Sequence, residues 1–310
     1  MRLTVGILQR VGGLVIVFLG VTFIIFFLVF ALPGDPIAAL GGDRPLSPSV
    51  VEALREKYGL NDPLWQQYLH WLGGLFTGDF GIDLKGRPVA DQLAARWPVT
   101  VTLALTAWVL EVVFGLGLGL IAALRAGKMT DRTILGLTIL ASSIPVFVLG
   151  SSAQLLFGVR LGWFPVAGTH AGWPVAYLLP AIIIAVLGLA ATSRLMRASA
   201  IEQLNADSVR LVRAKGVGEG RVVGVHVMRN SLIPAATFLA TDLGFLLGGT
   251  IIIEGIFNLP GVGNLLFSAV RAHEGPTVVA ISTLLIIIFL LTAALIDLLQ
   301  VALDPRLRRE

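Results

Sequence analysis

Residues 205–216 read Asn205-Ala-Asp-Ser-Val-Arg-Leu-Val-Arg-Ala-Lys-Gly216, a polar stretch in a chain that is otherwise mostly apolar. It is the centre of a longer basic segment, residues 194–233, that separates two apolar stretches. The segment has three acidic residues and seven basic ones: Arg194, Arg197, Arg210, Arg213, Lys215, Arg221 and Arg229. A chain does not need such a segment to stay in a bilayer, so we expect it to be a docking surface.

The sequence on either side has the composition of a membrane protein. Hydrophobic residues make up 56% of the 310 residues and charged residues 14%, whereas a soluble domain has about 25% charged residues. There is no cysteine, which excludes disulfides and thiolate metal sites. The net charge of +4 is better explained by membrane topology than by binding to nucleic acid, because basic residues collect on the cytoplasmic side.

Six apolar segments are long enough to cross a hydrocarbon core, which requires about 20 helical residues. They are predicted near residues 11–32, 99–124, 133–157, 175–193, 232–253 and 277–301, and Pro145 interrupts the third. The first is too long for a signal peptide and lacks an Ala-x-Ala cleavage site, so we expect it to be retained. The predicted fold is an all-α polytopic membrane protein with six transmembrane helices.

The predicted organisation has three parts. Residues 1–32 form the N-terminal tail and first span, residues 33–98 an extracytoplasmic loop with short helices, and residues 99–310 a five-helix core. With the N-terminus inside, inner segments hold fifteen Lys and Arg residues. Outside the long loop, whose charges have little influence on insertion, outer segments hold only two, Arg160 and Arg271. Both termini are therefore predicted to be cytoplasmic.

Two helices are predicted in the outer loop. Ser47 is placed to cap the first, with Pro48 at its first position and Gly59 at its end. The second, from Pro63 to Phe76, is rich in Trp and Tyr, which favour the membrane interface. We expect an extracytoplasmic cap that packs on the transmembrane helices.

The central polar stretch is predicted to form a short helix. Asp207 or Ser208 can cap a helix that begins at Val209, and Gly216 can end it. The cations of Arg213 and Lys215 are favourable at its C-terminal end. Binding to anionic lipid requires only the basic charge, so a defined helix favours docking to a protein.

The motifs that follow this helix resemble those of one family. Ala214-Lys215-Gly216, then His226 and Arg229-Asn-Ser-Leu-Ile-Pro234, are similar to the signature of permeases in binding-protein-dependent ABC importers. Pro33-Gly-Asp-Pro36, Gly78-Asp-Phe-Gly81 and the run from Glu254 to Gly263 extend the resemblance, which is greatest to the dipeptide/oligopeptide/nickel subfamily, along the whole chain. The sequence departs from the wider pattern where Arg210-Leu-Val212 replaces Glu-Ala-Ala, and Ser208 stands where the subfamily more often has Tyr.

The resemblance implies a type I importer permease in a bacterial or archaeal plasma (inner) membrane that forms half of a path for peptides. Nickel chelates, glutathione or another small solute are the alternatives. It also implies a coupling helix at about residues 205–218 that fits a groove in an ATPase. The predicted ATPase-coupling residues are Asn205, Asp207, Ser208, Arg210, Leu211, Arg213, Ala214, Lys215 and Gly216.

The implied partners are a second homologous permease, two ATP-binding subunits, an extracytoplasmic substrate-binding protein and the lipid bilayer, with no nucleic acid. We expect no cofactor in this chain and no enzymatic activity. ATP and Mg would be bound by the partner subunits, because none of the four lysines is followed by the Ser or Thr that a P-loop requires.

Carboxylates within spans are costly and suggest function. Asp242, midway through the fifth span, is the main candidate for the substrate path, and a hydrogen bond to a hydroxyl on a neighbouring helix is the competing interpretation. Glu254 is the second candidate, although stabilising the loop after it is favoured. Glu111 and Asp297 are further intramembrane carboxylates, and snorkelling or pairing with Arg306 explains Asp297 more simply.

Other chemistry is disfavoured. An intramembrane aspartyl protease would need Asp242 and Asp297 almost in contact, but they are predicted at different depths and lack the Gly-x-Gly-Asp pattern. His273-Glu274 has no second His at the spacing of a zinc protease, so no metal site is predicted. The pairs Gly115/Gly119 and Gly244/Gly248 are predicted to allow close helix packing.

Overall fold

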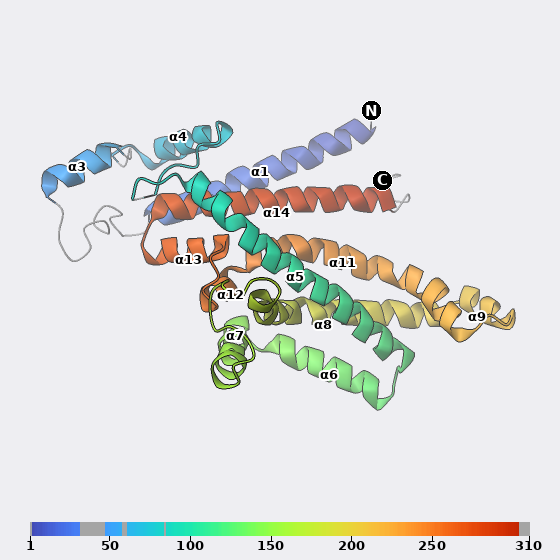
Figure 1. Ribbon diagram of the computed structural model, residues 1–310. Coiled ribbons are helices and arrows are strands. Elements are labelled where there is room, and N and C mark those ends of the chain that lie inside the picture. The colour runs from blue at the N-terminus through green and yellow to red at the C-terminus, as the bar shows by residue number, and fades with distance from the viewer. Residues whose placement is uncertain (1, 32–46, 58–60, 84, 304–310) are drawn as a thin grey trace. The chain divides into compact units, whose positions relative to one another are not determined.

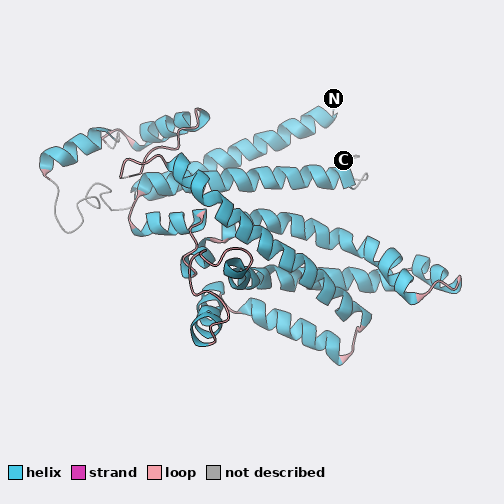
Figure 2. Cartoon of the chain, in the orientation of Figure 1, coloured by secondary structure: helices cyan, strands magenta, loops and turns pink. Residues whose placement is uncertain are grey.

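The computed structural model describes residues 2–31, 47–57, 61–83 and 85–303. Figure 1 and Figure 2 show that this part of the chain is almost entirely helical. Its only isolated bridge joins Ile82 and Pro88 in antiparallel pairing. Gly59, the Pro33–Pro36 motif and Arg306 lie outside the described residues.

Five long helices have the length and hydropathy to cross a membrane. They are α1 (Arg2–Ala31), α5 (Val89–Leu124), α8 (Val175–Asn205), α11 (Met228–Gly249) and α14 (Gly275–Leu303). A sixth span exists only if two shorter helices, α6 (Met129–Ser143) and α7 (Val146–Ala153), are counted together. The predicted positions are thus confirmed for five spans, and the third requires a correction.

The third span is not one helix with a tolerated proline. Ile144 is extended, with φ −83° and ψ 129°, because the ring of the following proline disfavours a helical conformation at the residue before it. Pro145 then stands immediately before α7. The axes on either side of the break differ by 97°, and α7 continues into a π-helix, η1 (Gln154–Arg160). This segment is a broken span or a re-entrant loop.

The chain divides into two compact units. Unit 1 comprises Met1–Val99 and Pro260–Leu291. It contains α3 (Pro48–Lys57) and α4 (Leu64–Phe76), which confirm the two helices predicted in the outer loop, and α13 (Val262–Arg271). As predicted, Pro48 occupies the first position of α3.

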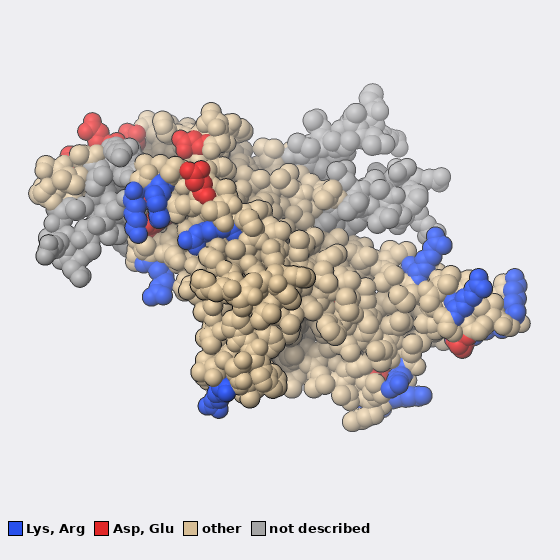
Figure 3. Space-filling view, in the orientation of Figure 1, with Lys and Arg blue, Asp and Glu red and all other residues tan. Residues whose placement is uncertain are grey.

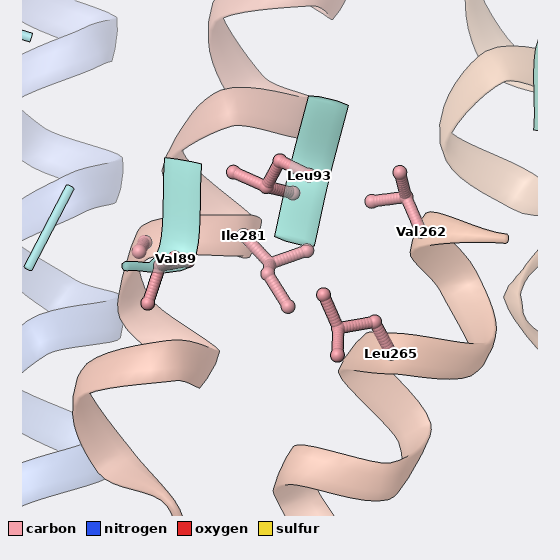
Figure 4. Packing of buried hydrophobic residues seen from close by; sticks show 6 residues of the cluster. Val89, Leu93, Val262, Leu265 and Ile281 are labelled. Atoms are coloured by element: carbon pink, nitrogen blue, oxygen red, sulfur yellow. The ribbon is translucent and has the colours of Figure 1, made fainter. Parts of the chain in front are cut away.

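Apolar packing holds unit 1 together. Figure 4 shows one core, where α5, α13 and α14 meet. Its buried residues are Val89, Leu93, Val262, Leu265, Ala280 and Ile281. A second core brings together Phe26 of α1, Tyr68 of α4 and Val279 of α14. The Tyr68 hydroxyl also lies 3.1 Å from the Thr22 hydroxyl, which fixes α4 against α1.

Unit 2 comprises Thr100–Leu259 and Thr292–Glu310. Its central element is α8, the most buried of the five long helices, which packs against α6, α7 and α11. Close packing of α5 on α8 depends on Gly115 and Gly119, because a Cβ at either position would lie within 2.8 Å of an α8 atom. The prediction is also confirmed for Gly244, where an added Cβ would lie 2.8 Å from Thr292, whereas at Gly248 no atom of the described residues lies within 4 Å of an added Cβ.

Candidate functional site

The predicted short helix is α9 (Asp207–Ala214), and its start differs from the prediction. The helix begins at Asp207, two residues before Val209, with Ala206 as the N-cap residue. No side chain caps it, so the predicted capping by Asp207 or Ser208 is wrong. The Ala206 carbonyl instead accepts hydrogen bonds from the amides of Val209 and Arg210. Asp207 lies in the first turn, where its negative charge favours the helix dipole.

The predicted end of α9 is confirmed. Gly216 adopts φ +77°, a conformation that residues with a Cβ rarely take. Its amide donates to the Arg213 carbonyl at 2.9 Å, and the Lys215 amide donates to the Leu211 carbonyl at 3.1 Å. Arg213 lies in the last turn, as predicted, and Lys215 is the C-cap residue. These hydrogen bonds end the helix, and the left-handed conformation of Gly216 turns the chain away from the helix axis.

One face of α9 is anchored in unit 2. Val209 is 1% exposed and joins a core with Ala123 of α5, Ala200 of α8, and Val222 and Val227 of the π-helix η2 (Val222–Val227). Because η2 runs directly into α11, and Ala206 alone separates α8 from α9, this core ties α9 to both long helices.

A polar clamp strengthens the turn after α9. The Arg213 guanidinium donates to both carboxylate oxygens of Glu219, at 2.6 and 3.2 Å, and to the Leu204 carbonyl at 3.4 Å. Glu219 begins the one-turn helix α10 (Glu219–Arg221). Hydrogen bonding to Glu219 raises the pKa of Arg213. Exposed ion pairs contribute little to stability, so the main effect of this clamp is to fix the conformation of the turn.

The outward face of α9 combines charge with one large apolar side chain. Leu211 is 58% exposed between the charged residues Arg210 and Arg213. Arg210 lies 3.4 Å from Asp207, and both are exposed. Ser208, Ala214 and Lys215 are exposed too, and Asn205 is the last, exposed residue of α8. Figure 3 shows Lys and Arg gathered at the end of unit 2 that carries α9.

An ion pair that sequence reasoning missed holds α8 near this region. The Arg197 guanidinium donates to both oxygens of Asp131, at 2.6 and 2.7 Å, and joins α8 to α6. The Asp131 side chain is 3% exposed and also accepts a hydrogen bond from the Gly127 amide. The only signal in the sequence was one acidic residue within an otherwise basic loop between two spans.

The two predicted path candidates lie in different surroundings. Glu254 is buried in α12 (Ile251–Ile256), where its carboxylate accepts hydrogen bonds from Thr100 and Thr250, both at 2.8 Å. Its backbone carbonyl accepts from the Leu259 amide, which closes the loop after α12. Asp242 is partly buried in α11.

The competing interpretation of Asp242 was a hydrogen bond to a hydroxyl on a neighbouring helix, but the Thr192 hydroxyl of α8 binds Glu111. Glu111 of α5 accepts a 2.5 Å hydrogen bond from Thr192 of α8. The carboxyl group of Asp242 faces that of Glu111. Sequence reasoning named both residues as intramembrane carboxylates but did not pair them. Among the described residues, no group of three or more His, Asp or Glu side chains is arranged to hold a metal.

Comparison with known proteins agrees with this architecture. Residues 115–309 match the family model described as "binding-protein-dependent transport system inner membrane component", and residues 3–104 match the model of the N-terminal part of such components. The glutathione transport system permease protein GsiC of Escherichia coli (strain K12) is 36% identical over 303 residues, which cover 97% of this chain and 98% of that protein. GsiC of Shigella flexneri serotype 5b (strain 8401) matches to the same extent.

A solved structure shares the fold. The crystal structure of an amino acid ABC transporter with histidines aligns with a TM-score of 0.52 and 14% identity, covering 67% of this chain and 92% of that one. At this identity the likeness concerns the fold alone. The whole-chain match to the relatives confirms the resemblance that the motifs predicted. The chain therefore belongs to the family of binding-protein-dependent transport system inner membrane components and is a permease subunit of an ABC importer.

Proposed function

We propose that this permease forms half of an ATP-driven import path for short peptides, glutathione among them, and is coupled to separate ATP-binding subunits through α9. The observation that carries the coupling is the geometry of α9, which is anchored through Val209 and presents Leu211 outward. The names of the relatives support the substrate class, because glutathione is itself a small peptide derivative.

The proposed complex has the chain, a second homologous permease, two ATP-binding subunits and an extracytoplasmic substrate-binding protein, all at a bacterial or archaeal inner membrane. Both termini and α9 lie on the cytoplasmic side. The distribution of Lys and Arg supports this orientation. ATP and Mg are bound by the partner subunits, and the chain itself catalyses no reaction.

The coupling residues of α9 act in two groups. Leu211 enters an apolar part of the groove on the ATP-binding subunit, and Asp207, Ser208, Arg210 and Lys215 contact its polar rim. Arg213, Ala214, Gly216 and Asn205 maintain the shape of the helix and its two turns. Because α9 joins α8 on one side and η2 and α11 on the other, a displacement of α9 moves both long helices.

For the path, we keep Asp242 as the candidate that lines it, since the residue as a whole is only partly buried in α11. Glu254 has a positioning role, since it is buried and bound to two threonine hydroxyls.

The substrate assignment is tested on the complete transporter in lipid vesicles with its substrate-binding protein. Glutathione, a dipeptide and a nickel chelate are compared for uptake and for stimulation of ATP hydrolysis. We expect uptake and stimulation of ATP hydrolysis either with glutathione alone or with both glutathione and the dipeptide. Stimulation by the nickel chelate alone, or by none of the three, contradicts the proposed substrate class.

Docking is tested separately with Leu211→Asp, and Leu161→Asp is the matched control because it changes another exposed leucine of unit 2. Burying a leucine contributes about 1.5–3 kcal/mol, so Leu211→Asp is expected to weaken binding of the ATP-binding subunit about tenfold or more. Co-purification and titration of that subunit measure the effect. Unchanged binding by Leu211→Asp rules out the docking assignment.

A further inference from the structure

Three helices of unit 2 meet at a buried carboxyl group. Glu111 of α5 is 0% exposed and is among the largest fully buried side chains of the described residues. The Thr192 hydroxyl of α8 donates to its Oε1 at 2.5 Å. Gly188, one turn earlier on α8, lies against the same carboxyl group, and a Cβ there would overlap it. The sequence of α8 thus leaves room for Glu111 and supplies one hydrogen-bond donor.

The second oxygen of Glu111 has a different neighbour. Oε2 is buried with no hydrogen-bond partner, and so is Oδ2 of Asp242 on α11. The two carboxyl groups nevertheless face each other closely enough to interact directly. Two acceptor groups therefore meet without a donor between them.

A neighbouring hydrogen bond fixes the register of these helices. The Trp108 indole on α5 donates to the Leu239 carbonyl on α11 at 2.8 Å. Glu111 and Asp242 each follow these residues by three positions, so they lie on the same helix faces one turn further along. The meeting of the carboxyl groups is thus built into the packing of α5 on α11.

Two adjacent carboxylates cannot both stay ionised in such a place, because each charge is desolvated and each repels the other. A protonated carboxyl group has an O–H donor as well as acceptor capacity. One proton would satisfy both unpartnered oxygens with a single hydrogen bond. The titratable group that faces Glu111 is Asp242, and α8 adds only the neutral Thr192 and Gly188.

We propose that Glu111 and Asp242 share one proton and form a proton-binding site that links α5 to α11 beside α8. Their titration belongs to the pair rather than to either residue. Loss of the proton would set two charges against each other and push α5 from α11, the helix that continues from η2 and α9. The proposal does not depend on which substrate is transported.

Infrared spectroscopy of the assembled transporter in lipid vesicles tests the proposal. At neutral pH the wild type is expected to give a carbonyl band of a protonated carboxylic acid. Glu111→Gln is expected to remove this band, and Asp242→Asn to shift or remove it because the partner oxygen changes. Glu202→Gln, which changes an exposed carboxylate on α8, is the control and is expected to leave the band in place.

Two glycine variants test the proposal in a second way, through the same infrared band. Gly188→Ala adds a methyl group against the Glu111 carboxyl and is expected to shift the band, whereas Gly117→Ala on α5 adds one where no atom lies within 4 Å and is not. Absence of a protonated carboxyl band in the wild type overturns the proposal. So does a band that is lost in Glu111→Gln but unmoved by Asp242→Asn, because Glu111 would then hold its proton alone.

Discussion

Single buried polar residues fix how the helices of unit 2 are arranged. Asp131 and Arg197 join α6 to α8 through two short hydrogen bonds, and Glu254 joins α12 to α5 through Thr100. Such groups are costly to bury unless each finds its partner. Their positions therefore specify one packing arrangement more strictly than apolar contacts would.

Asp131→Asn is expected to destabilise the permease strongly. The change leaves the partly buried Arg197 without its carboxylate, and breaking a buried ion pair from one side costs about 3–5 kcal/mol. Unfolding of the purified permease in detergent measures the loss, with the exposed Glu202→Gln as control. The double variant Asp131→Leu/Arg197→Met is expected to recover much of it, because it removes both charges. If Asp131→Asn is as stable as the control, the ion pair does not hold α6 to α8.

Asp83 provides a pH-dependent contact in unit 1. Burial alone raises the pKa of Asp83, but hydrogen bonds and charge from Arg87, with a further hydrogen bond from Gln92, outweigh it and hold the pKa below its usual value. The carboxylate accepts the Lys85 and Arg87 amides at 2.9 and 2.8 Å. Ionised Asp83 therefore organises this loop.

Because the pKa of Asp83 is lowered in the folded protein, this residue stabilises the fold when it is ionised. A carboxyl whose pKa is lower in the folded state stabilises the fold above its unfolded value of about 3.8, and that contribution is lost as the pH falls through the folded pKa. We expect amide protection at Lys85 and Arg87 to decrease over this acid range in the wild type. In Asp83→Asn it is expected to be low and independent of pH. Equal pH profiles for the two proteins, measured by hydrogen exchange and corrected for intrinsic rates, contradict this role.

At the scale of elements, two turns set the position of α9. Ala206 allows α8 to end and α9 to begin within one residue, and Gly216 redirects the chain toward α10 and α11. Val209 and the Arg213–Glu219 clamp hold the helix between these turns. A surface helix of eight residues is too short to be stable alone, so its shape depends on these attachments.

Gly216→Ala is expected to uncouple transport from ATP hydrolysis. A Cβ at φ +77° costs about 1–2 kcal/mol, which the turn would relieve by changing its conformation. Gly218→Ala is the matched control, because Gly218 has φ −61° and no atom within 4 Å of an added Cβ. Uptake per ATP hydrolysed by the reconstituted complex is expected to fall for Gly216→Ala only. If uptake per ATP hydrolysed is equal in the two variants, the conformation of Gly216 is not required for coupling.

At the scale of the whole molecule, the orientation in the membrane decides which partners each surface can meet. We expect α9 on the cytoplasmic side, and α3 and η1 on the opposite side. The chain has no cysteine, so single cysteines can be introduced without background labelling. Lys215→Cys, Ser49→Cys and Arg160→Cys report on α9, α3 and η1, and all three positions are exposed.

A thiol reagent that does not cross membranes is expected to label Ser49→Cys and Arg160→Cys in intact spheroplasts. Lys215→Cys is expected to react only after permeabilisation. Mass spectrometry or a gel-shift assay measures the labelling, and the cysteine-free wild type is the control. Labelling of Lys215→Cys from outside would reverse the proposed topology and remove α9 from the reach of the ATP-binding subunits.

The amino-acid sequence was enough to predict the class of protein, the positions of five spans, the helix at α9 and its end at Gly216. These features depend on composition, on the length of apolar runs and on local backbone preferences. All three can be evaluated from residues that are close together in the sequence. The sequence did not predict the 97° break at Pro145, the pairing of Asp131 with Arg197, or the meeting of Glu111 with Asp242. These depend on which helices pack together and in what register, and residues 66 or 131 positions apart leave no local signal of their contact.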